Sequence, residues 1–553
     1  MKKQLRILIR GIVFVFGLTP GFSHAQGILN NLQINGNFQV DVMYYQKDSA
    51  IGAQDVPEKL LMNGFGNINA TLGHFSAGIR YESYLNPMLG FDPRYKGTGI
   101  PYRYVSYKNE DLEITAGSFY EQFGSGMIFR SYEERNLGYD NAMDGIRVRY
   151  TPFAGVTIKG IYGLQRSFFS KGPGIVRGVD AEFSINEMIK KLNNAPARIM
   201  IGGSVISKYQ NADDPVYTLP KNVAAFAGRA SVAYKNINLS GEYAYKINDP
   251  SAINNRIYKP GNGLVIQATY SRKGFGVYLA AKRIDNMNFR SNRDAVGNDV
   301  IMNYLPALTK QHTYSLVAKY PYGTQPNGEA GIQGQVIYTF KKHSSLGGKY
   351  GTTVALNYSR ANAIDKQKIN DSTEIGQTGT LGYKSDFFKI GKEKYFEDIN
   401  VEISHKFSKK FKAILTYANF SYNVDVIESH AEGMVYAHVG VLDMTWSITD
   451  TKAIRTELQY LYTKEDDHEW AMGLLEYTIA PKWFFSVMDL YNYGNPEASK
   501  RIHYYKGSVA FAKGSNRLEL SYGRQYSGIL CVGGVCRYVP AANGITLTIT
   551  SSF

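Results

Sequence analysis

Residues 543–553 alternate between apolar and hydroxyl-bearing side chains, as an extended strand does. Ile545, Leu547, Ile549 and Phe553 fall on one face, and Thr546, Thr548, Thr550 and Ser552 fall on the other. Successive side chains of a strand point to opposite faces, so one face is apolar and the other is polar. A strand of about 9–11 residues also suffices to cross a membrane. The pattern predicts a membrane-spanning strand, although an edge strand of a soluble β-protein alternates in the same way.

The same alternation returns along the chain in segments separated by turn residues. It is clear in residues 32–45, 68–82, 146–150, 399–407 and 454–462. An apolar face toward lipid and a polar face toward a lumen are typical of a transmembrane β-barrel. A soluble sandwich alternates too, but rarely over so many consecutive segments. We therefore expect an all-β fold, a single large antiparallel transmembrane barrel.

The connections are alternately short and long, like the periplasmic turns and extracellular loops of bacterial barrels. Asn186–Asn194 has Met188, Ile189 and Leu192 at helical spacing, which predicts a short periplasmic helix. Both ends of the chain are expected in the periplasm, so the strand number should be even. We expect about 26 strands, with one strand hidden near Asp299–Leu305, and about 24 strands as the fallback. Long polar loops are expected at 46–59, 86–100, 121–143, 247–261, 285–310 and 362–395.

The N-terminus has the features of an export signal. Basic residues precede the apolar run 12–18, and the small residues Ser23 and Ala25 suit cleavage after Ala25. Gln26 follows, so the lipoprotein cysteine is missing. We expect a signal peptide at 1–25 and a barrel at 26–553. No folded plug domain precedes the first strand, which argues against a TonB-dependent transporter.

The formal net charge is +15, and the mean hydropathy is −0.28. The low hydropathy agrees with a barrel, whose alternating strands average out. A basic excess often indicates nucleic acid, but the export signal argues against that partner. We expect contact with outer-membrane lipid and with small polar or anionic solutes in a lumen; a solvated basic surface explains the charge equally well.

One long stretch carries a family resemblance. Residues 117–149 read GSFYEQFGSGMIFRSYEERNLGYDNAMDGIRVR. Together with Phe340–Gly351 and the closing strand, this stretch resembles a family of large Bacteroidota outer-membrane proteins known only as a domain of unknown function. The resemblance implies a barrel in the outer membrane and supplies no activity. The final Phe553 also resembles the terminal signature that the barrel-assembly machinery reads, which makes that machinery an expected partner.

Residues 121–143 have a composition unlike that of a solvated loop. Phe123, Met127 and Phe129 would be costly to expose, and Gly124 and Gly126 allow a sharp bend. We expect this segment to fold inward as a constriction whose charges select solutes; a packed plug that only stabilises the barrel is the alternative. The charged residues of the expected constriction are Arg130, Glu133, Glu134, Arg135, Asp140, Asp144, Arg147 and Arg149.

An Arg-x-Glu pattern recurs on the expected inward face. It occurs as Arg80 and Glu82, Arg455 and Glu457, and Arg517 and Glu519. Residues two apart on a strand share a face, so these pairs can join cross-strand ion ladders. They indicate either a charged permeation path or scaffolding that keeps lumen charges paired, and the scaffolding interpretation is favoured.

The two cysteines, Cys531 and Cys536, flank Val-Gly-Gly-Val. Gly533 and Gly534 suit both central positions of a type I′ turn. The cysteines then form a non-hydrogen-bonded pair with Cα atoms about 4.5 Å apart, within disulfide reach. We expect a disulfide in the last extracellular loop; two free thiols are the alternative, and a two-ligand metal site is less favoured.

Catalytic motifs are weak. The sequence has no His-Glu-x-x-His, no Gly-x-Ser-x-Gly and no phosphate-binding glycine loop, and the spacing from Asp140 to Gly145 fails the EF-hand pattern. We expect no cofactor, no metal and no enzyme activity. A channel is the favoured function, a structural or assembly component of an envelope or secretion complex is the close alternative, and an outer-membrane enzyme is less favoured.

Overall fold

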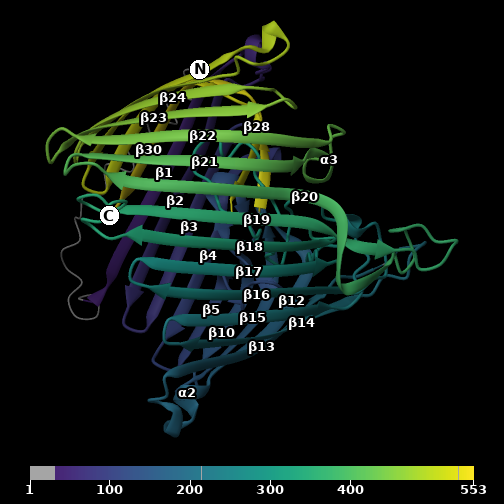
Figure 1. Ribbon diagram of the computed structural model, residues 1–553. Helices are drawn as coiled ribbons and strands as arrows, with labels where there is room; N and C mark the ends of the chain where they lie inside the picture. Colours follow the sequence, from purple (N-terminus) through teal and green to yellow (C-terminus); the bar gives the residue numbers. More distant parts are fainter. Residues whose placement is uncertain (1–30, 213, 533–534) are drawn as a thin grey trace.

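The computed structural model is a closed barrel (Figure 1). It describes residues 31–553 except 213 and 533–534. Its 24 barrel strands pair antiparallel, each with the next barrel strand along the chain. β1 (Gln33–Gln46) pairs with β30 (Ala542–Ser552) and closes the ring. The large antiparallel barrel expected from the alternation is confirmed.

The barrel strands follow one another around the ring. The first half continues with β2 (Leu60–Leu72), β3 (Phe75–Asn86), β4 (Gly97–Lys108), β5 (Leu112–Phe119), β10 (Met143–Tyr150), β11 (Val156–Ser167), β12 (Ser170–Ser184), β13 (Ala197–Tyr209), β14 (Asn222–Tyr234), β15 (Ile237–Lys246), β16 (Gly261–Arg272) and β17 (Phe275–Asp285). The second half comprises β18 (Glu329–Phe340), β19 (Thr352–Gln367), β20 (Lys384–Lys406), β21 (Phe411–Asn423), β22 (Met434–Ser447), β23 (Lys452–Thr463), β24 (Trp470–Ile479), β25 (Trp483–Tyr491), β26 (His503–Lys513) and β27 (Asn516–Gln525).

Smaller elements lie in the connections. The short strands are β6 (Gln122–Phe123), β7 (Phe129–Arg130), β8 (Glu133–Glu134), β9 (Tyr139–Asp140), β28 (Gly528–Val532) and β29 (Val535–Val539). The helices are η2 (Ser49–Ile51), η3 (Pro93–Tyr95), η4 (Arg135–Leu137), α2 (Ile185–Met188), η5 (Lys190–Leu192), η6 (Ala252–Asn254), α3 (Val424–Ile427) and η7 (Ala498–Lys500). In the described part of the chain, no helix is long and apolar enough to cross a membrane.

β3 shows how the ring acquires an apolar outside and a polar inside. Ile79 and Tyr81 are 45% and 49% exposed, whereas Arg80 and Glu82 are 3% and 1% exposed. Alternate residues of a strand face opposite sides, so the exposed apolar set faces outward and the buried charged set faces the lumen. The outer face is therefore the apolar belt that a lipid bilayer requires.

The expected strand number needs a correction. The expectation of about 26 strands is wrong, and the fallback of about 24 is right. Residues 286–328 join β17 to β18, and Asp299–Leu305 forms no barrel strand; its only bridge joins Arg290 to Ile301. Met302 in this stretch is 0% exposed. The sequence of this segment resembles that of a strand because the segment contains apolar side chains that become buried. Its backbone is nevertheless irregular.

The two ends of the barrel differ in their connections. We call the end where β1 begins and β30 finishes the turn end, and the opposite end the loop end. The expected helix at Asn186–Asn194 lies at the turn end as α2 followed by η5. The β19–β20 pair extends beyond the ring at the loop end (Figure 1). The expected signal peptide at 1–25 lies outside the described residues.

Phe553 contacts the first strand. Its backbone exchanges two hydrogen bonds of 2.9 Å with Gly36. A Cβ atom on Gly36 would lie 2.6 Å from the Phe553 ring, so glycine leaves room for the aromatic side chain. This contact fixes the register of the closing pair at the turn end; recognition of Phe553 by assembly machinery stays a prediction.

The expected disulfide is confirmed. Cys531 and Cys536 are paired residues of the β28–β29 hairpin, with Cα atoms 4.1 Å apart, and their sulfurs are bonded. The glycines of the expected turn, 533–534, lie outside the described residues. The hairpin belongs to the β27–β30 connection at the loop end.

We predict that neither cysteine reacts with iodoacetamide in protein unfolded without reductant, and that both react after reduction. The disulfide removes both thiolates, which are the reactive species. Mass spectrometry of the tryptic peptide would detect the adducts. Labelling of either cysteine before reduction would contradict the prediction.

Candidate functional site

Residues 121–142, which connect β5 to β10, bury their apolar side chains against the wall. Phe123, Met127, Ile128 and Phe129 are 0% exposed. They share one cluster with side chains of β11 to β17, namely Ile161, Val176, Ile206, Ala225, Ala227, Ala244, Val265 and Ile284. On β14, Ala225 alternates with the exposed Phe226. The wall side of the cluster is therefore the inner face of the barrel.

A glycine bend carries the 121–142 segment past β15. Gly124 and Gly126 have φ values of 53° and 95°, in the left-handed region that favours glycine. The Ser125 backbone N–H donates a 2.8 Å hydrogen bond to Glu242 Oε2. A Cβ atom on Gly124 would lie 2.6 Å from that oxygen. Both backbone conformation and space therefore require glycine at 124.

Buried charges join the 121–142 segment to the wall. Asp140 lies between Arg80 of β3 and Arg166 of β11, and its Oδ2 is 2.6 Å from Arg166 Nη1. Glu82 lies 2.7 Å from Arg80 Nε and 2.6 Å from Arg166 Nη2. Glu133 adds a 2.8 Å contact to Arg80. Buried charges are tolerated only when paired, and here every guanidinium faces carboxylates.

The remaining charges of the expected constriction pair more locally. Glu133 Oε1 lies 2.8 Å from Arg135 Nε. Glu134 caps η4 through its side-chain oxygen. Arg130 places its guanidinium carbon 4.3 Å from the centroid of the Tyr132 ring. These side chains therefore hold the internal shape of the segment, whereas Asp140 and Glu133 attach it to the wall.

Arg147 and Arg149 share the inner face of β10 and form no ion pair with Glu133, Glu134 or Asp140. Arg147 contacts Glu113 and Glu121, the latter at 3.5 Å. Arg149 is exposed, close to the turn end of the strand. Arg147 thus pairs with one acid of the 121–142 segment, Glu121, whereas Glu133 and Asp140 contact Arg80.

Asp144 lies outside the lumen, contrary to expectation. It shares a strand face with Ile146, which is 51% exposed on the outer side. Its Oδ2 lies 2.6 Å from Lys171 Nζ and 4.0 Å from Arg103 Nη2. The first residues of β10 already follow the period of the strand, so Asp144 turns away from the segment that precedes it.

The three Arg-x-Glu pairs form within their strands. Arg80 with Glu82 and Arg455 with Glu457 are in contact, and Arg517 lies 2.8 Å from Glu519. Arg455 also reaches acids on both neighbouring strands, β22 and β24. The acids that these arginines contact balance the arginine charges. This agrees with the interpretation that the pairs are scaffolding that keeps the charges of the inner wall paired.

The pKa of Asp140 makes the contact of the 121–142 segment with Arg80 and Arg166 of the wall dependent on pH. Burial raises the pKa of this carboxyl, but Arg166 and Arg80 outweigh it and lower the pKa from its ordinary 3.8. A lowered folded-state pKa stabilises the folded form above the ordinary value, and that stabilisation is lost as pH falls through the folded pKa. We predict unchanged hydrogen-exchange protection of 121–142, after correction for intrinsic rates, from pH 8 to about 5, with loss only below about 4. Loss near pH 6 would contradict this assignment.

Residues 286–328, which connect β17 to β18, form a second buried segment that sequence reasoning missed. It is attached to the wall by Lys282 of β17, whose Nζ lies 2.7 Å from Oε1 of Glu329, the first residue of β18. The same Nζ donates 2.6 Å and 2.7 Å hydrogen bonds to Pro306 O and Thr324 Oγ1. Tyr322 donates a 2.6 Å hydrogen bond to Glu329. Lys282 and Glu329 are both completely buried.

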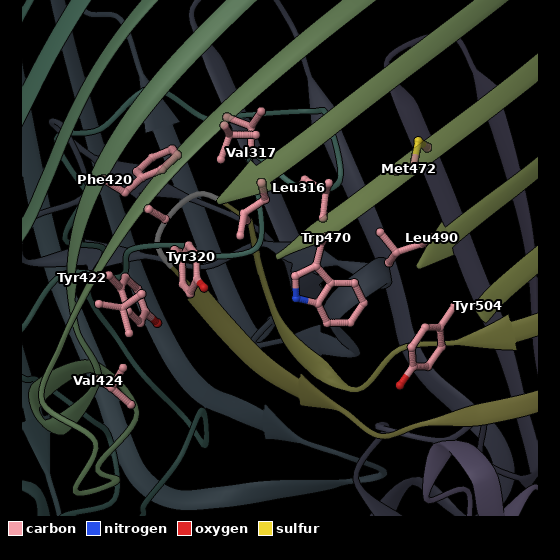
Figure 2. Packing of buried hydrophobic residues seen from close by; sticks show 14 of the residues in the cluster. Leu316, Val317, Tyr320, Phe420, Tyr422, Val424, Trp470, Met472, Leu490 and Tyr504 are labelled. Atoms are coloured by element: carbon pink, nitrogen blue, oxygen red, sulfur yellow. The ribbon is translucent and has the colours of Figure 1, made fainter. Parts of the chain in front are cut away.

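The middle of the 286–328 segment reaches β20, β22 and the connection between β23 and β24, on another part of the ring. Its contacts are Lys310 with Glu402 at 3.2 Å, His312 with Asp398 at 2.9 Å, Tyr314 with Asp443 at 3.1 Å and Lys319 with Asp466 at 2.8 Å. Figure 2 shows Leu316, Val317 and Tyr320 of the segment among Phe420, Tyr422 and Trp470. Burial lowers the pKa of Lys319, but Tyr526, Tyr320 and the nearby aspartates outweigh it and raise that pKa well above its usual value.

The two segments bind each other. The Arg130 N–H donates to Met302 O at 2.8 Å, and the Tyr304 N–H donates to Gly126 O at 2.9 Å. Asn141 Nδ2 donates to Ile301 O at 2.8 Å. The chain from Gly126 to Asn141 is thus held from one side by the wall and from the other by residues 301–304. The sequence signal that could have indicated this buried contact is the presence of apolar residues, such as Met302, within a long loop.

A model of a family of unknown function, DUF6029, matches residues 1–553. The chain belongs to this family. No curated protein sequence matches the chain.

Several solved barrels are similar to this family member in structure at very low identity. The translocation pore of the P pilus usher PapC has 10% identity and a TM-score of 0.42, over 94% of this chain and 99% of that chain. The siderophore receptor PirA from Pseudomonas aeruginosa has 8% identity and a TM-score of 0.41, over 94% and 80%. OccAB3 from Acinetobacter baumannii has 9% identity and a TM-score of 0.34, over 95% and 99%.

Proposed function

We propose that this protein is an outer-membrane channel for small polar solutes, with a path narrowed by the 121–142 and 286–328 segments. The supporting observation is the polar attachment of both segments to the inner wall, through Asp140, Lys310 and His312. Barrels of 16–18 strands already leave an aqueous channel, so a ring of 24 strands without a filling would leave a wide one. Two segments bound across it reduce that width.

The charge of the proposed path is more balanced than the whole chain suggests. The net charge of +15 favours anionic solutes on average. On the inner wall, however, Arg80, Arg166 and Arg455 are each neutralised by carboxylates. We therefore propose polar solutes as the class, with local groups rather than net charge deciding the preferred sign.

A plug that only stabilises the barrel is the second candidate, because the same segments are very well packed. Phe123, Met127, Ile128 and Phe129 are 0% exposed, as are Met302 and Val317. Such burial would also suit a structural component of an envelope or secretion complex. The two candidates differ in whether removing a segment changes permeation.

Planar-bilayer recording separates the candidates. β5 and β10 are adjacent, with Met143 opposite Phe119, so a short turn can replace residues 123–142. We predict that wild-type protein conducts and that this deletion raises conductance and the uptake of bulky solutes into liposomes. A deletion that assembles normally and leaves permeability unchanged would reject the channel narrowing. Release of the protein from membranes by carbonate alone would reject the membrane location.

A further inference from the structure

A cavity of about 210 Å³ lies on the inner wall beside the glycine bend at 124–126. The bend and strands β12 to β16 line it, and its polar side chains are Ser125, Glu182, Arg229, Ser231, Ser240, Glu242 and Gln267. Pockets for drug-sized ligands measure about 300–1,000 Å³, so this one suits a molecule the size of a single sugar or amino acid.

Glu242 is the unusual member of this lining. It is 6% exposed, and its Oε2 accepts the Ser125 N–H while its Oε1 is buried without a hydrogen-bond partner. Arg229 lies directly opposite Glu242 on β14, yet its guanidinium turns to Asp180 at 2.7 Å and to Glu182 at 3.2 Å. Within the described part of the chain, no cationic side chain lies within 4.0 Å of the Glu242 carboxylate.

An isolated buried carboxylate is costly, because it loses hydration and gains no opposite charge. The other deeply buried acids avoid this cost, since each faces a cationic or histidine side chain. They are Glu82, Asp180, Asp249, Asp285, Glu329, Asp398, Asp443 and Glu457. Glu242 therefore lacks the partner that every comparable acid has, and it lacks that partner inside a cavity.

We propose that the cavity binds the ammonium group of a small hydroxylated solute, with the Glu242 carboxylate as the acceptor. Ser231, Ser240 and Gln267 supply hydrogen bonds to hydroxyl groups, and Val265 contacts the carbon skeleton. An anion is disfavoured because Arg229 is already paired, and the described residues provide no group of three metal-binding side chains. The inference rests on the proposed function only in that the solute reaches the cavity through the lumen.

Calorimetric titration of the purified full-length barrel in nanodiscs tests this site. Glucosamine and glucose are a matched pair of probes, because they differ in one ammonium group. Wild-type protein is expected to bind glucosamine at least about tenfold more tightly than glucose, as one charge-assisted hydrogen bond provides. Glu242→Gln is expected to abolish the difference. Glu519→Gln, which removes an equal charge paired with Arg517 on β27, should preserve it.

Thermal unfolding without solute checks that Glu242→Gln stays folded. The amide oxygen can still accept the Ser125 N–H, and loss of an uncompensated charge should leave the unfolding temperature equal or higher. Equal binding of both sugars to wild-type protein, or a retained preference in Glu242→Gln, would overturn the site. Selective binding without conductance would reject the channel function and support the Glu242 site. Conductance without selective binding would support the channel function and reject the Glu242 site.

Discussion

Replacing residues 287–327 with a short glycine-rich turn is expected to raise single-channel conductance by about an order of magnitude, because a ring this wide leaves an aqueous lumen when unfilled. The turn is feasible since Ile284 and Glu329 are paired neighbours on β17 and β18. The ion pair between Lys282 and Glu329 lies within the retained strands. The backbone pairing of the barrel does not pass through the deleted residues, so we expect normal assembly.

The matched control removes residues 369–374, the largely exposed tip of the β19–β20 connection. This deletion also shortens a loop at the loop end, but it takes no buried apolar side chain from the lumen. Its conductance should equal that of the wild type. Similar conductance in both deletions, with both proteins correctly folded, would show that the 286–328 segment does not obstruct the path.

Asp140→Asn is expected to weaken docking of the 121–142 segment by about 3 kcal/mol, or about a hundredfold in the docking equilibrium. The substitution leaves Arg80 and Arg166 buried with Glu82 and Glu133 but without the carboxylate between them. Both buried guanidiniums lose a carboxylate that contacts them directly, which is the reason for the large effect. Faster hydrogen exchange in peptides from 121–142, together with more frequent openings in bilayer recordings, would measure it.

Asp92→Asn provides the control for this prediction. Asp92 pairs with Arg94, but their side chains are 34% and 56% exposed. Exposed ion pairs contribute about 0–1 kcal/mol, so neither exchange nor gating should change measurably. Equal effects of the two substitutions would contradict the role assigned to the buried cluster.

The architecture could be predicted because it depends on a local signal. In a strand such as β3, the alternation of Ile79 and Tyr81 with Arg80 and Glu82 identifies the two faces without information from the rest of the chain. The strand number could not be predicted as reliably. Residues 299–305 bury apolar side chains inside a lumen, and the sequence does not distinguish that environment from lipid.

The site was predictable only where its partners are close in sequence. The contact between Arg80 and Glu82 follows from a spacing of two on one strand. Arg166 and Glu242 were missed because each meets the 121–142 segment across the interior of the ring. Such contacts depend on the path of a connection through the lumen, for which no periodic pattern exists.

The pairing of β1 with β30 also has a kinetic consequence. It joins the strands most distant in sequence, and contacts of that kind are slow to form because a long chain must first be restrained. Until the seam closes, both strands present unpaired backbone edges that can recruit other chains. Productive maturation therefore requires these edges to be shielded throughout the slow stage, so the rate of seam closure, rather than the final stability of the ring, should limit the yield of inserted protein.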